Sequence, residues 1–171
     1  MERWAEIPEF PEYSVSDHGR VVNENSGKFM TLSRNQQGYC MAFLRHNGKQ
    51  ATRSVTVLVA DAFVPRDVSL PHFDSIIHRD GNKTNLRYTN LERRPRWFAI
   101  MYHRQFEYFR FHGKLTKYGI EDPVIDLDSG EIFDNSTFAA IKYGLLEIDI
   151  VKCIHNQTGT FPYGRRFALV S

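Results

Sequence analysis

Turn-forming residues interrupt the first fifty residues so often that only short strands fit between them. A Ser-Asp-His-Gly turn separates two β-prone runs in YSVSDHGRVVN, and an Asn-Gly pair at positions 47 and 48 separates two apolar segments. An Asn-Gly pair in that setting is a strong signal for a β-hairpin, because both residues tolerate positive φ. The pattern predicts a small antiparallel sheet with Trp4, Phe10 and Tyr13 in its core.

The rest of the chain mixes helical and strand patterns. Residues 55–65 predict a short helix or a buried strand that ends at Pro65, and the aromatic and basic run from residue 96 is compatible with a helix that Gly113 ends. The last fifty residues predict a hairpin in PVIDLDSGEIFD, two short helices separated by Gly144, and a final strand. Ser136 is the expected N-cap of the first of these helices.

Composition is typical of a folded, water-soluble chain. Hydrophobic residues make up 42% of the 171 residues and aromatic residues 13%, which is sufficient for a packed core. No apolar run is long enough for a membrane span and no signal-peptide core is visible, so we expect a cytoplasmic protein without membrane contact. Cys40 and Cys153 lie far apart without Cys-x-x-Cys spacing, which predicts two buried free thiols.

Charge is distributed very unevenly along the chain. Residues 79–117 contain ten Lys/Arg and three Asp/Glu, whereas residues 118–150 contain one Lys and eight Asp/Glu. The basic block suits a polyanion, because neutralised phosphates release counterions. The acidic block would repel that polyanion or bind a basic protein partner. A solvated charged surface accounts for either block equally well.

Four motifs follow one another in an order that is typical of one family. They are WAEIPEFPEYSVSDHGRVVNENSGK, VLVADAFVP, HRDGNKTNLRYTNLE, and STFAAIKYGLLEIDIVKCI followed by YGRRFAL. With these motifs the chain resembles, over nearly its whole length, the small phage and intron-encoded HNH homing endonucleases that begin with a NUMOD4 module. Each motif is weak by itself, and their common order makes the resemblance specific.

The resemblance implies an α+β fold made of four modules. These are a NUMOD4-like antiparallel β module at 1–50, an HNH-like ββα-metal core at 51–103, a basic and aromatic linker helix at 104–118, and a C-terminal β-hairpin plus helix-turn-helix module at 119–171. It also implies double-stranded DNA as the partner, a monomeric state, and the cytoplasm of a bacterial host if the protein comes from a phage.

The same resemblance implies metal-dependent nicking of DNA. In such sites a histidine activates water and a divalent cation, Mg²⁺ or Mn²⁺, polarises the scissile phosphate. By motif, His78 is the general base and Asn90 braces it. Asp80, Gly81 and Asn82 form the turn that shapes the loop.

Three positions depart from the family pattern. Ile77 and Ala99 stand where the family commonly has metal ligands, and Thr56 stands where relatives commonly have a histidine. Hard divalent cations need oxygen or imidazole ligands. Asp74 and His103 are the nearby residues that could replace the missing ligands.

The C-terminal module departs as well, because Glu147 and Asp149 open a helix that would meet DNA better with basic or amide residues. Three functions therefore stay open: an active nickase, a catalytically inactive relative that binds DNA, and a regulator or inhibitor that binds a protein through the acidic segment 118–150. The candidate DNA contacts are Arg79, Lys83, Arg87, Arg93, Arg94, Arg96, Arg104, Arg110, Lys152, Arg165 and Arg166.

Overall fold

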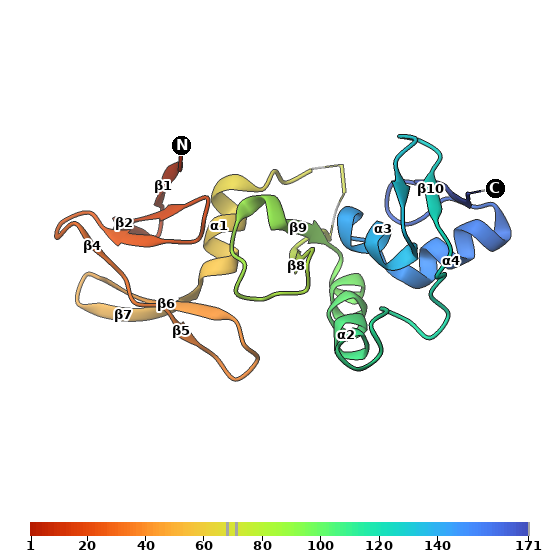
Figure 1. The fold of residues 1–171 in the computed structure, drawn as a ribbon. Coiled ribbons are helices and arrows are strands. Elements are labelled where there is room, and N and C mark those ends of the chain that lie inside the picture. Colours follow the sequence, from red (N-terminus) through yellow and green to blue (C-terminus); the bar gives the residue numbers. More distant parts are fainter. Residues whose placement is uncertain (68, 71, 171) are drawn as a thin grey trace. The chain divides into compact units, whose positions relative to one another are not determined.

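The computed structural model describes residues 1–67, 69–70 and 72–170, which form two compact units of mixed α and β structure (Figure 1). The first unit comprises residues 1–78 and 82–96, and the second comprises residues 79–81 and 97–171. The α+β class expected from the sequence is confirmed. The four modules drawn from the motifs remain a prediction, because the division into two units follows different boundaries.

The first unit begins with a four-stranded antiparallel sheet. Its strands are ordered β1-β2-β3-β4, with bounds Trp4–Ile7, Phe10–Ser16, Val21–Asn23 and Lys28–Phe29. A second antiparallel sheet follows, ordered β5-β6-β7, with bounds Ser33–Arg34, Cys40–His46 and Lys49–Ser54. The turn between β6 and β7 has φ of 51° at Asn47 and 75° at Gly48, so the predicted hairpin is confirmed.

The core of this unit contains two of the three aromatic residues expected there. Phe10 and Tyr13 are 6% and 5% exposed, but Trp4 is 38% exposed, so its placement in the core was wrong. Side chains alternate between the faces of a strand. Ile7 points into the core, and Trp4, three positions earlier, points away from it. The indole instead lies beside the Phe29 ring, with 6.0 Å between ring centroids.

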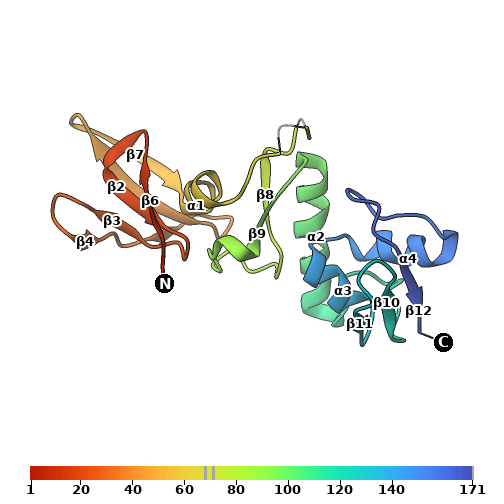
Figure 2. The same cartoon turned by 90° about the horizontal axis from the view of Figure 1, so that it is seen from above.

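A short helix and a hairpin complete the first unit. The helix α1 (Val55–Phe63) lies alongside the strands in both ribbon views (Figures 1 and 2) and ends before Pro65, as predicted. β8 (Ser75–His78) pairs antiparallel with β9 (Leu91–Arg94), and the 3-10 helix η1 (Tyr88–Asn90) precedes β9. The register aligns His78 with Leu91, the residue after Asn90.

The second unit combines three helices with a small sheet. The helix α2 (Arg96–His112) belongs to the second unit from Trp97 onward. Gly113, whose φ is 70°, follows its last residue and ends it. The antiparallel sheet is ordered β11-β10-β12, with bounds Ile132–Phe133, Val124–Asp126 and Phe167–Leu169. The other helices are α3 (Ser136–Tyr143) and α4 (Glu147–Asn156).

The boundary between α3 and α4 matches the expected glycine, but the helix start differs. Gly144 ends α3 with a φ of 61°. The N-cap is Asn135 rather than Ser136, because the Asn135 side chain accepts a hydrogen bond from the Phe138 amide. Ser136 is instead buried, and its hydroxyl donates to Glu147 at 2.7 Å.

Residues 79–81 belong to the second unit although their chain neighbours on both sides belong to the first. The Tyr102 hydroxyl donates to the Arg79 carbonyl at 2.6 Å, and the Arg79 guanidinium donates to the Lys142 carbonyl at 2.6 Å. Gly81 has a φ of 72°, and a Cβ there would lie 2.3 Å from the Phe106 ring. This position therefore requires glycine.

The cysteines and the helices bear on two further expectations from the sequence. Cys40 and Cys153 are both buried and free, as predicted. Of the helices in the described part of the chain, none has both the length and the apolar character that crossing a membrane requires.

Candidate active site around His78

His78 occupies the last position of β8, where a β-prone run meets the Asp80-Gly81 turn. Its side chain is completely buried. Thr56, in the first turn of α1, is also buried, and its Oγ1 lies 3.3 Å from His78 Nε2. A hydroxyl at that distance can accept a hydrogen bond from a protonated Nε2 or donate one to an unprotonated Nε2, so Thr56 is placed to select the imidazole tautomer.

A tyrosine that the sequence did not identify packs against the same ring. The ring centroids of Tyr39 and His78 are 6.0 Å apart. Burial raises the pKa of the Tyr39 phenol. The Lys83 ammonium lies 4.6 Å from the Tyr39 ring centroid and donates to the Gln37 carbonyl at 3.0 Å. Lys83 thus joins the loop after β8 to the turn before β6.

Asn90 lies next to this site along the hairpin. Its Nδ2 donates to the Asn85 carbonyl at 3.0 Å, which stabilises the loop between β8 and β9. Because His78 is in register with Leu91, the ladder brings His78 and Asn90 to the same end of the hairpin. The bracing of His78 by Asn90 remains a prediction.

The expected metal-ligand positions offer no ligand atoms. Ile77 and Ala99 are both buried and apolar. Of the two suggested replacements, Asp74 is exposed and pairs with Arg66 at 3.2 Å, and His103 lies on α2 in the second unit. A resident Mg²⁺ or Mn²⁺ is therefore not supported by the side chains at the family positions.

Across residues 1–67, 69–70 and 72–170, a single group of three potential metal-ligating side chains gathers, and it lies elsewhere, at Glu2, Asp17 and His18. Arg3 donates to Asp17 at 2.9 Å and Arg20 to Glu2 at 3.0 Å. These arginines already neutralise the two carboxylates, and hydrogen bonding to Arg20 lowers the pKa of Glu2 to about 2. A divalent cation would have to displace both guanidinium groups, so the cluster is better described as an ion-pair network.

Two of the predicted DNA contacts are part of the interior of the fold. Arg93 is buried, donates to the Ala60 carbonyl at 3.0 Å near the end of α1, and pairs with Asp61 at 2.8 Å. Arg94 is fully buried and pairs with Glu92 at 2.9 Å. Both side chains therefore have structural partners, and neither is exposed to a phosphate in this structure.

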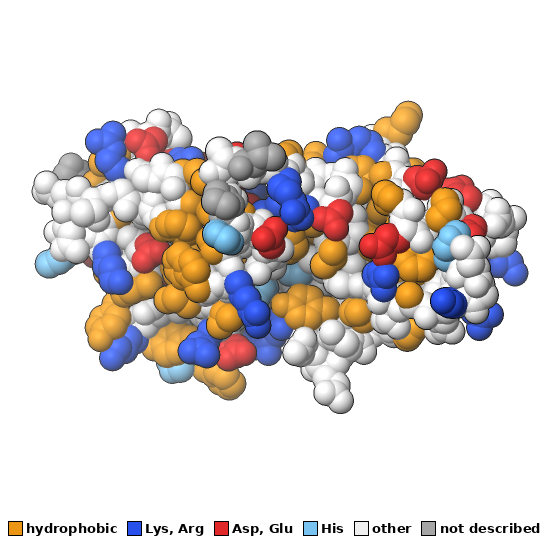
Figure 3. Space-filling model, turned by 180° about the vertical axis from the view of Figure 1, so that it is seen from behind, with side chains coloured by type: hydrophobic (Ala, Val, Ile, Leu, Met, Phe, Trp, Pro, Cys, Tyr) orange, Lys and Arg blue, Asp and Glu red, His pale blue; other side chains and the backbone are white. Residues whose placement is uncertain are grey.

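The other basic candidates differ in how available they are. Arg165 pairs with Asp126, and Arg166 pairs with Asp128 at 3.4 Å. On the face drawn in space-filling form, basic side chains are scattered among acidic ones (Figure 3). The candidates that are exposed and form no ion pair among the described residues are Arg87, Arg96, Arg104, Arg110 and Lys152.

The chain is similar to several known proteins. A model of the NUMOD4 motif matches residues 2–45. The chain is 34% identical over 90 residues to an uncharacterised HNH endonuclease, L245, of Acanthamoeba polyphaga mimivirus, covering 53% of this chain and 26% of that protein. It is 32% identical over 94 residues to the H-N-H endonuclease F-TflII of Escherichia phage T5, covering 53% of this chain and 47% of that protein.

The fold agrees with these matches. A solved structure described as "DNA binding and cleavage by the HNH homing endonuclease I-HmuI" superimposes with a TM-score of 0.51 over 98% of both chains, at 24% identity. The resemblance predicted from the motifs is thereby confirmed: the chain is similar to HNH endonucleases, and the NUMOD4 motif matches its N-terminal part. It spans less than half the length of the two curated relatives, at 26% and 47%.

Proposed function

We propose that this protein binds double-stranded DNA and that His78 is the general base of a strand-nicking reaction. The observation that supports this most is the position of His78, held at the end of β8 with Thr56 Oγ1 at 3.3 Å from its Nε2. A base that must take one proton from water needs a defined tautomer and a fixed ring. If Thr56 Oγ1 accepts a hydrogen bond from the protonated Nε2, Nδ1 is the nitrogen that removes a proton from the attacking water.

A divalent cation, when bound, would polarise the scissile phosphate. Ile77 and Ala99 supply no side-chain ligand for it, so these two positions do not fit a resident ion and we assign no step to one. The part of the reaction that we assign to the chain is the proton transfer at His78 and the positioning of the duplex.

A second candidate is DNA binding without cleavage. It is favoured by the apolar residues at the ligand positions and by the complete burial of His78, since a buried ring cannot reach water or phosphate until it is uncovered. Under this alternative the family fold retains its DNA surface and has lost its chemistry.

The DNA surface that we propose is the exposed basic part of α2, with Arg96, Arg104 and Arg110. These side chains form no ion pair among the described residues, so phosphates need not displace an existing partner. Lys152 and Arg87 are weaker candidates, because Lys152 has no other Lys or Arg beside it in α4 and Arg87 lies in the loop before η1.

Plasmid nicking with Mg²⁺ or Mn²⁺ tests the catalytic assignment, with His78→Ala as the test variant and His155→Ala, an exposed histidine on α4, as the matched control. We expect nicking by the wild type and the control, and none by His78→Ala. Persistent nicking by His78→Ala would overturn the assignment of the base.

DNA binding is measured in parallel by fluorescence anisotropy over a series of salt concentrations. Salt-sensitive binding without nicking in either metal would establish the second candidate. Absence of both nicking and binding would overturn the proposed function as a whole.

A further inference from the structure

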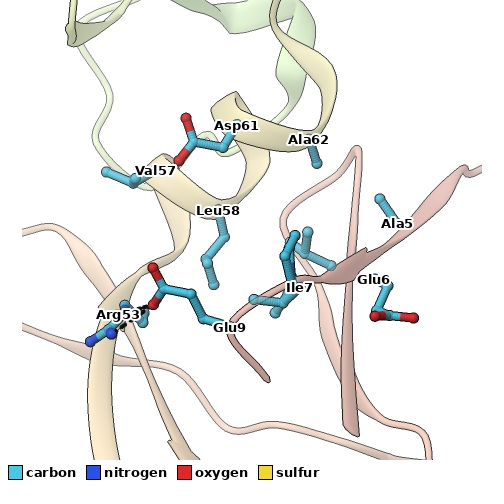
Figure 4. A pocket seen from close by; sticks show the side chains of 11 residues that line it. Ala5, Glu6, Ile7, Glu9, Arg53, Val57, Leu58, Asp61 and Ala62 are labelled. Carbon is cyan, nitrogen blue, oxygen red and sulfur yellow. Dashed lines mark hydrogen bonds and ion pairs between the residues drawn. The ribbon is translucent and has the colours of Figure 1, made fainter. Parts of the chain in front are cut away.

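A groove separates β1 from α1 in the first unit (Figure 4). Its volume is about 360 Å³, which is within the usual range of ligand pockets, roughly 300–1,000 Å³. The walls are apolar: β1 contributes Ala5 and Ile7, and α1 contributes Val57, Leu58 and Ala62. The close-up shows Leu58 and Ile7 facing each other across the space.

The strand that forms one wall has an open edge. Among the described residues, β1 pairs with β2 alone and stands at the end of its sheet. The Asp17 amide donates to the Arg3 carbonyl at 3.0 Å, so this pair is a hydrogen-bonded one. Hydrogen-bonded and non-hydrogen-bonded pairs alternate in an antiparallel ladder. The backbone groups of Trp4 and Glu6 therefore point away from β2, toward the open edge.

The charges at the rim are mainly negative. Glu6, Glu9 and Asp61 surround the groove, against one lining cation, Arg53. Glu9 pairs with Arg53 at 2.7 Å, and Asp61 is partly neutralised by an arginine outside the groove. Glu6 is exposed and forms no ion pair within the described part of the chain. Glu6 is thus the rim carboxylate without an ion-pair partner among the described residues, and it attracts lysine or arginine rather than a phosphate.

The two faces of β1 differ in polarity. Ala5 and Ile7 lie on the face of the strand toward the groove, and Glu6 lies on the opposite face, at the rim (Figure 4). A strand added alongside β1 would share this alternation. Every second side chain would enter the groove, and the intervening ones would lie beside Glu6.

We propose that this groove binds an extended segment of a partner protein, in which branched apolar residues alternate with lysine or arginine, as an additional strand paired with β1. Main-chain hydrogen bonds to an exposed edge supply affinity in this mode of recognition, and the alternate side chains supply specificity. The site is separate from His78 and does not depend on the proposed DNA function. Duplex DNA suits this edge poorly, because a backbone phosphate would meet the Glu6 carboxylate.

The test uses fluorescein-labelled acetyl-Lys-Val-Lys-Val-Lys-Val-amide as the probe and the full chain as the receptor. We expect saturable anisotropy, with shifts of the backbone amide NMR signals of residues 4–7, residue 9 and residues 57–62. The matched peptide with glutamate in place of lysine should bind at least tenfold more weakly.

Two variants separate the groove from general charge attraction. Ala62→Phe fills the groove and Glu6→Lys reverses the rim charge, and each should weaken binding of the lysine probe at least tenfold. Glu24→Lys, an exposed acidic residue outside the groove, is the control and should leave binding within twofold of wild type. Equal binding of the two peptides, equal loss in the control, or no saturable binding would overturn the proposal.

Discussion

At the scale of single residues, Thr56 has the most specific relationship to the candidate base. The sequence marked it only as a departure from the family, because a histidine is common at this position. The structure adds a buried contact, 3.3 Å from Oγ1 to His78 Nε2, between residues 22 positions apart. Neither periodicity nor turn chemistry could have predicted a contact of that range, since it depends on how α1 packs against β8.

Thr56→Val should impair nicking without impairing DNA binding. Valine keeps the shape of threonine and removes the hydroxyl that fixes the imidazole tautomer, so both tautomers become populated. Histidine side-chain ¹⁵N NMR measures that population directly, and plasmid nicking measures its effect on rate. The control is Thr52→Val, an exposed threonine on β7. An unchanged tautomer population in Thr56→Val would remove Thr56 from the site.

The ion pair between Glu2 and Arg20 gives a pH prediction. The hydrogen bond from Arg20 lowers the pKa of Glu2 from 4.5 to about 2. A carboxyl group with a depressed pKa contributes stability above its unfolded pKa, and that contribution is lost as pH falls toward the folded value. Between about pH 4.5 and 2, Glu2→Gln should therefore lose less stability than the wild type. Thermal unfolding at several pH values measures this, and parallel curves for the two proteins would contradict it.

Arg93 shows how the fold limits which of the predicted DNA contacts are exposed. In the sequence it stands in the run Arg-Arg-Pro-Arg at positions 93–96, and nothing local distinguishes it from Arg96. In the structure it donates to a carbonyl of α1 and pairs with Asp61, some thirty residues earlier. Sequence composition identifies a basic segment, but the tertiary fold decides which of its arginines remain exposed.

At the scale of elements, Glu147 changes the interpretation of α4. The sequence placed this acid at the start of a DNA-facing helix, where it would oppose phosphate. It is instead fully buried and accepts hydrogen bonds from Ser136 at 2.7 Å, Thr137 at 2.6 Å and the Thr116 amide at 2.7 Å. The carboxylate therefore joins the starts of α3 and α4 to the segment after α2.

Glu147→Ala should destabilise the second unit by about 1–3 kcal/mol, because it leaves several buried donors without an acceptor. Chemical denaturation followed by tryptophan and tyrosine fluorescence measures the change. Glu121→Ala, an exposed acid paired with Lys114, is the comparison and should cost much less. Equal effects of the two substitutions would show that the Glu147 network contributes little.

The elements themselves were predicted best where the signal is local. The Asn47-Gly48 hairpin, the end of α2 at Gly113 and the break at Gly144 all follow from residues that adopt positive φ. The pairing of β12 with β10 was beyond this reasoning, because the two strands are more than forty residues apart and their register is set by packing. Tyr39 carried no signal for the same reason, since its proximity to His78 depends on the whole first unit.

At the scale of the whole molecule, the net charge of +2 conceals the basic part of α2. If Arg96, Arg104 and Arg110 contact phosphates, replacing any one of them by alanine should weaken binding to all DNA sequences equally. Each replacement should also reduce the slope of the logarithm of the binding constant against the logarithm of salt concentration by about 1. Anisotropy titrations at several salt concentrations give the slope. Lys28→Ala, on β4, is the control. If the slope stays at the wild-type value when all three arginines are replaced together, α2 is excluded as the phosphate-binding element.

The assignment of residues 79–81 to the second unit affects how the gene can be divided. The chain supplies three residues to that unit and then returns to the first until Arg96. A fragment that begins at Trp97 would lack the carbonyl that accepts from Tyr102 and the glycine that lies against Phe106. Recombination at the boundary after Arg96 would thus separate residues that contact each other within the second unit. A gene segment would encode the intact second unit only if it also included the codons for residues 79–81, which follow His78.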